Sequence, residues 1–170
     1  MTPVPSSPAV RGIGKVITSP DSAGLIEGVR IRPVTLWPDD RGYFLEIERL
    51  AQVETIQVST ALSYPGAIKA FHYHRLQTDF WTPVAGMFQV ALIDLREGSR
   101  THRAVNTLYV GALRPWQITI PPGVAHGYKI LGRDPGVLVY LTDRFYNPDD
   151  EGRIPYNDPD LNYDWELQHK

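Results

Sequence analysis

Residues 67–74 read AIKAFHYH, and the alternation within this stretch decides the expected fold. Successive side chains of a β-strand point to opposite faces of its sheet. His72 and His74 therefore share one face, and Phe71 and Tyr73 share the other. The stretch, which follows a YPG turn, predicts a strand that carries two histidines on a single face.

Similar short segments recur on both sides of this strand, with turn residues between them. Strands of this kind, closely spaced and separated by Gly, Pro and Asp, are typical of an all-β sandwich or small barrel. We therefore expect an all-β fold. The segments read GVRIRPVTLW, YFLEIERL, ETIQVSTALS, FWTPVAGMFQVALIDL, VNTLYV, WQITI and GVLVYLTDRFY.

Parity also relates the histidine strand to two later segments. His126 and Tyr128 share a face in PPGVAHGYKIL, and Tyr140 lies on one face of VLVYLT. If these faces turn inward, a barrel interior holds His72, His74, His126 and Tyr140 together. A lone buried His or Tyr is common, but four that converge indicate a site.

Composition limits the possible partners and location. The 170 residues suit one domain with a sizeable core. A formal net charge of −2 gives no electrostatic reason to expect nucleic acid or membrane as a partner. No apolar run flanked by basic residues is visible near the N-terminus, so we expect a cytoplasmic protein. The chain has no cysteine, so His and carboxylate groups would have to hold any metal.

Six motifs, in the same order, resemble those of the dTDP-4-dehydrorhamnose 3,5-epimerase family of the cupin superfamily, in a divergent form. This resemblance extends from about residue 28 to residue 166. It implies a cupin jelly-roll barrel over 28–170, a short N-terminal arm over 1–27, and a homodimer. The motifs are DDRGYFLE (39–46), KAFHYH (69–74), LIDLREGS (92–99), IPPGVAHGY (120–128), the pair Tyr140 and Tyr146, and YNDPDLNYDWE (156–166).

The resemblance implies an isomerase that epimerises a 4-keto-6-deoxyhexose carried on dTDP, without a cofactor. The ketone acidifies the adjacent C–H bonds, so a base can form an enolate, and reprotonation from the opposite face inverts the carbon. His72 corresponds to the family's base and Tyr140 to its acid. An imidazole suits the task because its unperturbed pKa lies near neutrality.

The same correspondence implies a set of substrate contacts. Lys69 would meet the pyrophosphate, while Arg41 and Glu46 would reach the site of a neighbouring subunit. The implied substrate-binding residues are Arg41, Glu46, Lys69, His74, His126 and Tyr146.

Two departures from the family pattern bear on this chemistry. We expect no counterpart for the aspartate that follows the family's last motif and orients its histidine. Asp79 stands where the family has a lysine that stabilises the enolate oxygen, and a carboxylate there has the wrong sign for that role. His74 also replaces a glutamine.

These departures leave two alternatives open. The spacing of one His-x-His pair, one carboxylate and one later histidine also resembles metal-binding cupins, with Asp in place of Glu. Three His and one carboxylate suit a divalent ion such as Zn, Fe, Mn or Ni. One alternative is therefore a metal-dependent enzyme, and the other a non-catalytic relative that binds sugar nucleotides. The metal ligands would be His72, His74, Asp79 and His126.

Overall fold

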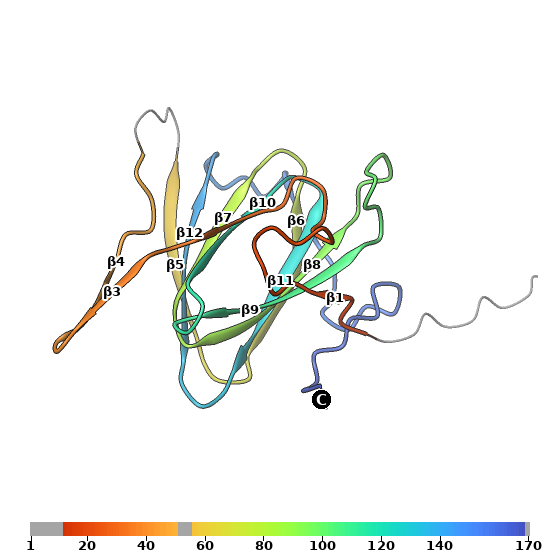
Figure 1. Ribbon diagram of the computed structural model, residues 1–170. Helices are drawn as coiled ribbons and strands as arrows, with labels where there is room; N and C mark the ends of the chain where they lie inside the picture. Colours follow the sequence, from red (N-terminus) through yellow and green to blue (C-terminus); the bar gives the residue numbers. More distant parts are fainter. Residues whose placement is uncertain (1–11, 51–55, 169–170) are drawn as a thin grey trace, which may run out of the picture.

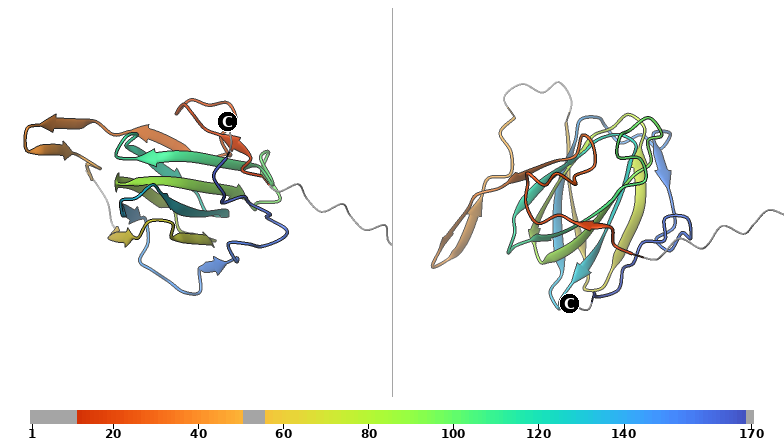
Figure 2. Two further views of the ribbon diagram at one scale, coloured as in Figure 1. Left: turned by 90° about the horizontal axis from the view of Figure 1, so that it is seen from below. Right: turned by 45° about the vertical axis from the view of Figure 1, so that its right-hand side comes forward.

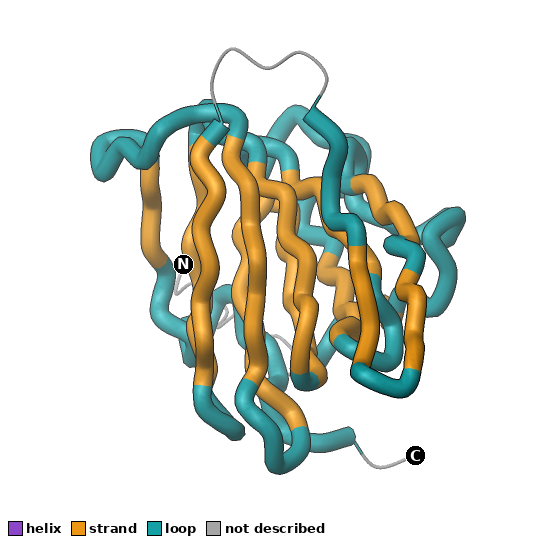
Figure 3. Tube along the Cα trace, turned by 90° about the vertical axis from the view of Figure 1, so that its left-hand side faces the viewer, coloured by secondary structure: helices purple, strands orange, loops and turns teal. Residues whose placement is uncertain are grey.

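The computed structural model describes residues 12–50 and 56–168. Within these ranges the chain forms thirteen strands and no helix, which confirms the all-β prediction (Figures 1 and 3). No helix of the described residues is long and apolar enough to span a membrane.

Eleven of the strands form two sheets that face each other (Figures 1 and 2). All neighbouring pairs are antiparallel except β1 and β9. The six-stranded sheet consists, in order, of β1 (Lys15–Val16), β9 (Val105–Gly111), β8 (Met87–Asp94), β11 (Val124–Leu131), β6 (Ile68–His74) and β13 (Glu151–Arg153). The five-stranded sheet consists of β2 (Arg30–Pro33), β10 (Trp116–Ile120), β7 (Asp79–Ala85), β12 (Gly136–Thr142) and β5 (Gln57–Ser63).

The main core fills the space between the sheets. Strands β8, β9, β10 and β11 contribute alternate side chains to it, because successive residues point to opposite faces. Phe88 and Val90 of β8 meet Ile118 of β10 and Leu138 of β12, all of them fully or almost fully buried. Burial of each such side chain contributes about 1.5–3 kcal/mol to folding.

A second apolar cluster covers the outer face of the six-stranded sheet. Phe71 of β6 points to this face, as the alternation in AIKAFHYH predicts, and packs against Tyr163 and Trp165 of the C-terminal segment. The indole N–H of Trp165 donates a hydrogen bond to the Tyr156 carbonyl at 3.0 Å. The motif at 156–166 therefore closes the outer face of the strand that carries the histidines.

The packed fold begins before residue 28. Residues 12–27 belong to the expected N-terminal arm, yet β1 pairs with β9, and Ile17 and Ile26 are buried in the main core. Residues of the expected arm therefore contribute to the packed part of the described chain. Residues 1–11 lie outside the described part of the chain.

The LIDLREGS motif stabilises a loop and does not reach the cavity. The buried carboxylate of Asp94 accepts hydrogen bonds from Arg96 at 2.8 and 2.9 Å, from Ser99 at 2.6 Å and from Thr101 at 2.7 Å. Burial alone would raise the pKa of Asp94, but the hydrogen bonds from Arg96 and Ser99 outweigh it and hold the pKa well below its ordinary value.

One hairpin extends away from the two sheets. Strands β3 (Leu36–Asp39) and β4 (Gly42–Leu45) pair only with each other among the described residues (Figure 1). Phe44 is 63% exposed and its ring lies 5.6 Å from that of Trp37. The hydroxyl of Tyr43 donates to the Val84 carbonyl at 2.6 Å, which ties the hairpin to the edge of the body.

Replacement of Trp165 tests the role of the C-terminal segment. We expect Trp165→Ala to lower the free energy of unfolding by about 3–5 kcal/mol, because it removes a buried ring from the outer face of β6. Leu167→Ala is the matched control, since Leu167 is 76% exposed in the same segment, and we expect a change within about 0.5 kcal/mol. Urea unfolding measures both, and equal effects would contradict the packing role.

Candidate active site

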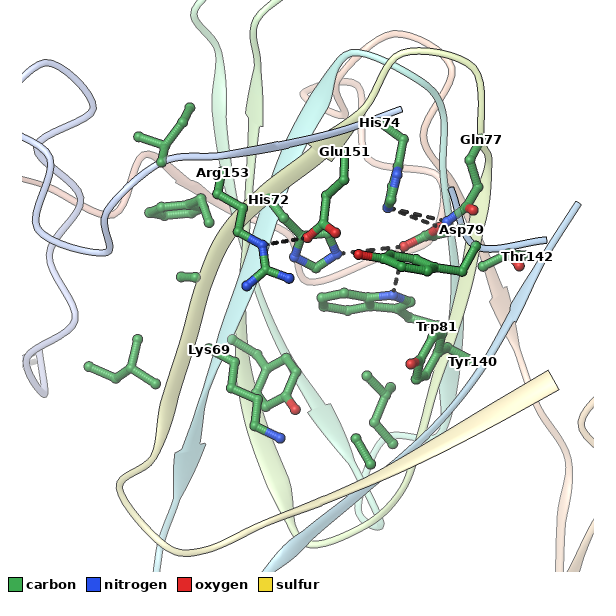
Figure 4. Close-up of a pocket in the computed structure, with 18 of the residues that line it drawn as sticks. Lys69, His72, His74, Gln77, Asp79, Trp81, Tyr140, Thr142, Glu151 and Arg153 are labelled. Atoms are coloured by element: carbon green, nitrogen blue, oxygen red, sulfur yellow. Dashed lines mark hydrogen bonds and ion pairs between the residues drawn. The ribbon is translucent and has the colours of Figure 1, made fainter. Parts of the chain in front are cut away.

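A cavity of about 770 Å³ lies between the two sheets (Figure 4). Strands β6 and β13 contribute to one wall, and β5, β7 and β12 contribute to the other. Small-molecule sites commonly measure about 300–1,000 Å³. The volume therefore suits a ligand of moderate size, such as a sugar nucleotide or part of one.

Three histidines of the six-stranded sheet form a cluster at this cavity. His72 and His74 point inward from β6, and His126 of β11 is the direct cross-strand partner of His72. The ring centroids of His72 and His126 are 4.1 Å apart, and those of His72 and His74 are 5.5 Å apart. The side chain of His72 is 31% exposed, whereas that of His74 is 7% exposed. His72 is therefore the accessible member of the cluster.

Asp79, the first residue of β7, joins the histidines from the opposite sheet. Its buried carboxylate accepts hydrogen bonds from the Gln77 amide at 2.7 Å and the Trp81 indole at 3.3 Å. The Oδ2 atom lies 3.1 Å from Nε2 of His126 and 3.9 Å from Nε2 of His72. Asp79 thus supplies a carboxylate beside His72. From the family resemblance we expected no aspartate partner for this histidine after the last motif.

Burial and charge set the protonation of the cluster. Burial lowers the pKa of His72, and the neighbouring His126 lowers it further, so His72 is neutral near pH 7. Burial also lowers the pKa of His74. For Asp79, burial would raise the pKa, but hydrogen bonds from His126 and Gln77, with the nearby ring of His72, outweigh it and hold the pKa far below its ordinary value. A neutral imidazole therefore lies next to an ionised carboxylate.

Hydrogen bonds orient the two buried imidazoles. Nδ1 of His126 lies 2.8 Å from the Val124 carbonyl and donates its proton to it, since a carbonyl can only accept. Nδ1 of His74 lies 3.7 Å from the Asp150 carboxylate, and its Nε2 lies 3.2 Å from the Gln77 amide nitrogen, which can only donate. In both residues Nε2 is the atom that faces Asp79.

Tyr140 lies on the wall opposite His72. It belongs to β12, where it pairs with Trp81 of β7, and it lines the same cavity. The Trp81 ring lies 6.0 Å from the His72 ring, and Figure 4 shows it beside Tyr140. His72 and Tyr140, which the family resemblance implies as base and acid, therefore come from different sheets and line the same cavity.

Charged side chains form part of the remaining cavity wall. Lys69 and Tyr146 line the cavity, as expected for substrate-binding residues. Glu151 and Arg153 of β13 also line it and form an ion pair at 2.8 Å (Figure 4). Sequence reasoning missed both, because they belong to none of the six motifs that indicated the family. The separation of Glu151 and Arg153 by one glycine was the available signal, since it places them on one face of a strand.

Three expected substrate contacts do not reach the cavity of this chain. Arg41 lies on the hairpin and pairs with Asp39 at 2.6 Å, and Glu46 pairs with Arg49 at 2.6 Å. Neither lines the cavity, so their expected role at a neighbouring subunit's site stays a prediction. His126 is buried behind His72 with both ring nitrogens close to protein atoms, so it supports the cluster and does not face a ligand directly.

The fold and the cavity together define the class of protein. Two facing antiparallel sheets with a histidine-lined cavity between them form the jelly-roll barrel of the cupins. A solved structure described as a dTDP sugar isomerase from Desulfovibrio desulfuricans G20 superposes on this fold with a TM-score of 0.77. It is 24% identical, and the match covers 82% of this chain and 92% of that one.

The sequence comparisons identify the family. The sequence model of dTDP-4-dehydrorhamnose 3,5-epimerase matches residues 24–170. The chain is 42% identical to the spore coat polysaccharide biosynthesis protein SpsL of Bacillus subtilis, over 86% of this chain and all of the relative. This chain belongs to the dTDP-4-dehydrorhamnose 3,5-epimerase family and is an isomerase, as the motifs predict.

Another solved structure that is similar to this chain contains a bound sugar nucleotide. It is a dTDP-6-deoxy-D-glucose-3,5-epimerase RmlC from Legionella pneumophila, in complex with dTDP-4-keto-L-rhamnose. Its identity to this chain is 26% and its TM-score is 0.72, over 85% of this chain and 82% of that one.

The lowered pKa of His74 makes stability depend on pH. The folded-state pKa of His74 lies below its ordinary value of about 6.5, so the unfolded chain binds more protons below that pH. Stability should therefore rise with pH up to about 6.5 and level off above it, with a slope of at most about 1.4 kcal/mol per pH unit from each such histidine. We expect His74→Gln to have a smaller slope in urea unfolding between about pH 5 and 7. An unchanged slope would show that His74 does not titrate in this way.

Proposed function

We propose that this chain epimerises a dTDP-linked 4-keto-6-deoxyhexose through an enolate, with His72 as the base and Tyr140 as the acid. The observation that carries the proposal is the arrangement of these two residues on opposite walls of one cavity. Inversion of a carbon requires removal of a proton from one face and delivery to the other. Two proton-transfer groups on facing walls fit this requirement.

The environment of His72 suits proton abstraction. Burial lowers its pKa, so the ring is neutral and has a free lone pair near pH 7. When it takes the proton, it becomes an imidazolium whose Nε2 is 3.9 Å from the ionised Asp79. Opposite charges at this separation favour the protonated ring. Asp79 therefore performs the stabilising role of a carboxylate partner from an unexpected position in the chain.

Tyr140 completes the exchange from the five-stranded sheet. Its hydroxyl delivers a proton to the opposite face of the enolate. Solvent then reprotonates the phenolate and takes up the proton that the imidazolium of His72 releases. The reaction conserves all atoms of the sugar and transfers no electrons, so it requires no cofactor.

The substrate class is supported by charge as well as by family. Lys69 is a cation on the cavity wall that suits the pyrophosphate of a nucleotide sugar. The Legionella relative, whose fold matches this chain, was solved with dTDP-4-keto-L-rhamnose. We assign Tyr146 and Lys69 to substrate binding, with Lys69 nearest the pyrophosphate.

We also propose a homodimer. The β3–β4 hairpin carries exposed Trp37 and Phe44, and the edge strand β5 exposes Val58 and Leu62. A second copy of the chain would cover these apolar side chains and the outer edge of β5, which pairs with no further strand among the described residues. Light scattering after size exclusion measures the mass, and a monomer at micromolar concentration would contradict this proposal.

A solvent-exchange assay tests the base. With a dTDP-4-keto-6-deoxyhexose in D2O, the wild-type protein should incorporate deuterium at C3 or C5. We expect His72→Ala to slow this incorporation by at least about 100-fold, because it removes the group that takes the proton. His102→Ala is the matched control, since His102 lies on an exposed loop away from the cavity. Tight dTDP binding without exchange by the wild type would instead indicate a non-catalytic binding protein.

Replacement of Tyr140, the proposed acid, should give a different result in the same exchange assay. We expect Tyr140→Phe to lose epimerised product by about 100-fold or more, because no proton reaches the opposite face. His72 still removes the proton and returns a deuteron to the same face, so deuterium should enter with retained configuration. NMR of the sugar distinguishes retention from inversion. Continued formation of inverted product by Tyr140→Phe would exclude Tyr140 as the acid.

A further inference from the structure

We propose that His72, His74, Asp79 and His126 form a binding site for one divalent transition-metal ion of the zinc type. The proposal depends on the positions of the four potential ligand atoms and not on the epimerase reaction. The four residues come from three strands of two sheets, β6, β11 and β7. One ligand atom from each lies within 4.8 Å of the others.

The separations between these atoms are close to those around a single ion. Two ligands at about 2.0–2.2 Å from a tetrahedral zinc ion lie roughly 3.4 Å from each other. Here Nε2 of His126 lies 3.1 Å from Asp79 Oδ2, and Nε2 of His72 lies 3.9 Å from the same atom. Nε2 of His74 lies 3.9 Å from Oδ1 of Asp79. Small side-chain rotations therefore bring all four to coordinating distance.

The outer contact of His126 already orients it as a ligand. Metal-bound histidines usually donate their second ring N–H to a carbonyl or carboxylate. Nδ1 of His126 donates to the Val124 carbonyl at 2.8 Å. Nδ1 of His74 makes no hydrogen bond within the described part of the chain and lies 3.7 Å from the Asp150 carboxylate. In both rings Nε2 is the nitrogen that faces Asp79.

Nε2 of His126 and Oδ2 of Asp79 need a proton or a cation between them. Since Nδ1 of His126 already donates to Val124, its Nε2 and the Oδ2 of Asp79 would otherwise meet as two acceptors at 3.1 Å. A shared proton or a metal ion meets this need, and the three histidines with one carboxylate form a donor set that zinc and its neighbours prefer.

Gln77 competes with an ion for this position. Its amide nitrogen lies 2.7 Å from Asp79 Oδ1 and 3.2 Å from His74 Nε2, so its N–H groups are directed at the lone pairs that a metal would use. Gln77 is buried beside the cluster, whereas His72 is 31% exposed toward the cavity. An ion can therefore enter past His72 and bind once the Gln77 side chain rotates away.

The site would couple to the proposed reaction through His72. A metal ion on Nε2 would oppose the positive charge that the same imidazole ring gains when it takes a proton. A metal-bound chain should therefore lose the proton-abstracting function that we propose for His72.

Zinc binding by the full chain, without any sugar nucleotide, tests the proposal. After treatment with EDTA and desalting, calorimetric titration with zinc chloride should give one ion per chain. We expect His74→Gln and Asp79→Asn to weaken binding by about tenfold or more, because each removes a ligand. His102→Gln, a histidine on an exposed loop, should bind like the wild type. Circular dichroism checks that each variant is folded.

Gln77→Ala gives a result that a purely structural cluster would not. Removal of the competing amide should tighten zinc binding, whereas a surface-bound ion would be indifferent to this change. Cobalt(II) provides a second readout, because three nitrogen ligands and one carboxylate should give a visible absorption band that His74→Gln removes.

Specific outcomes would overturn the proposal. Zinc bound at less than about 0.1 ion per wild-type chain excludes the site, and binding that depends on His102 but not on His74 moves it to the surface. Deuterium exchange at an unchanged rate with zinc bound would disprove the competition for His72. Because binding is measured without substrate, failure of the epimerase proposal leaves this test valid.

Discussion

The buried carboxylate of Asp79 is the interaction on which the site depends. A charge removed from water is costly unless hydrogen bonds and opposite charges compensate for it. Gln77, Trp81 and His126 provide that compensation, and each is thereby held in one orientation. His72 lies at the edge of the same group with its ring open to the cavity. The position of the His72 ring therefore depends on the interactions that stabilise the buried carboxylate of Asp79.

The two-sheet architecture brings this group together. Asp79 begins a strand of the five-stranded sheet, while the histidines belong to the six-stranded sheet, and the chain crosses between sheets in the short turn after His74. The apolar cluster of Phe71, Tyr163 and Trp165 covers the outer face of the histidine strand. One strand therefore carries both an apolar face packed by the C-terminal segment and a polar face that lines the cavity.

Much of the fold and part of the site could be predicted. Alternation indicated the strands and the face that His72 and His74 share, and ordered motifs indicated the family. The position of Asp79 was left between two interpretations, because its place in the family motif suggested proximity to the enolate oxygen whereas the metal-cupin spacing grouped it with the histidines. Glu151, Arg153 and Gln77 were not singled out, since nothing local distinguishes a cavity-lining charge from a solvated one.

The sequence by itself determined the strand periodicity, the face that each side chain takes, and the membership of the family. These properties depend on local backbone geometry and on residue order, which a sequence contains directly. Only the tertiary structure decided that Asp79 contacts the histidines, that His126 lies behind His72, and that the β3–β4 hairpin holds Arg41 away from the cavity. Those outcomes depend on the register between strands and on how the two sheets face each other, and both are set by long-range packing and by the burial of charge.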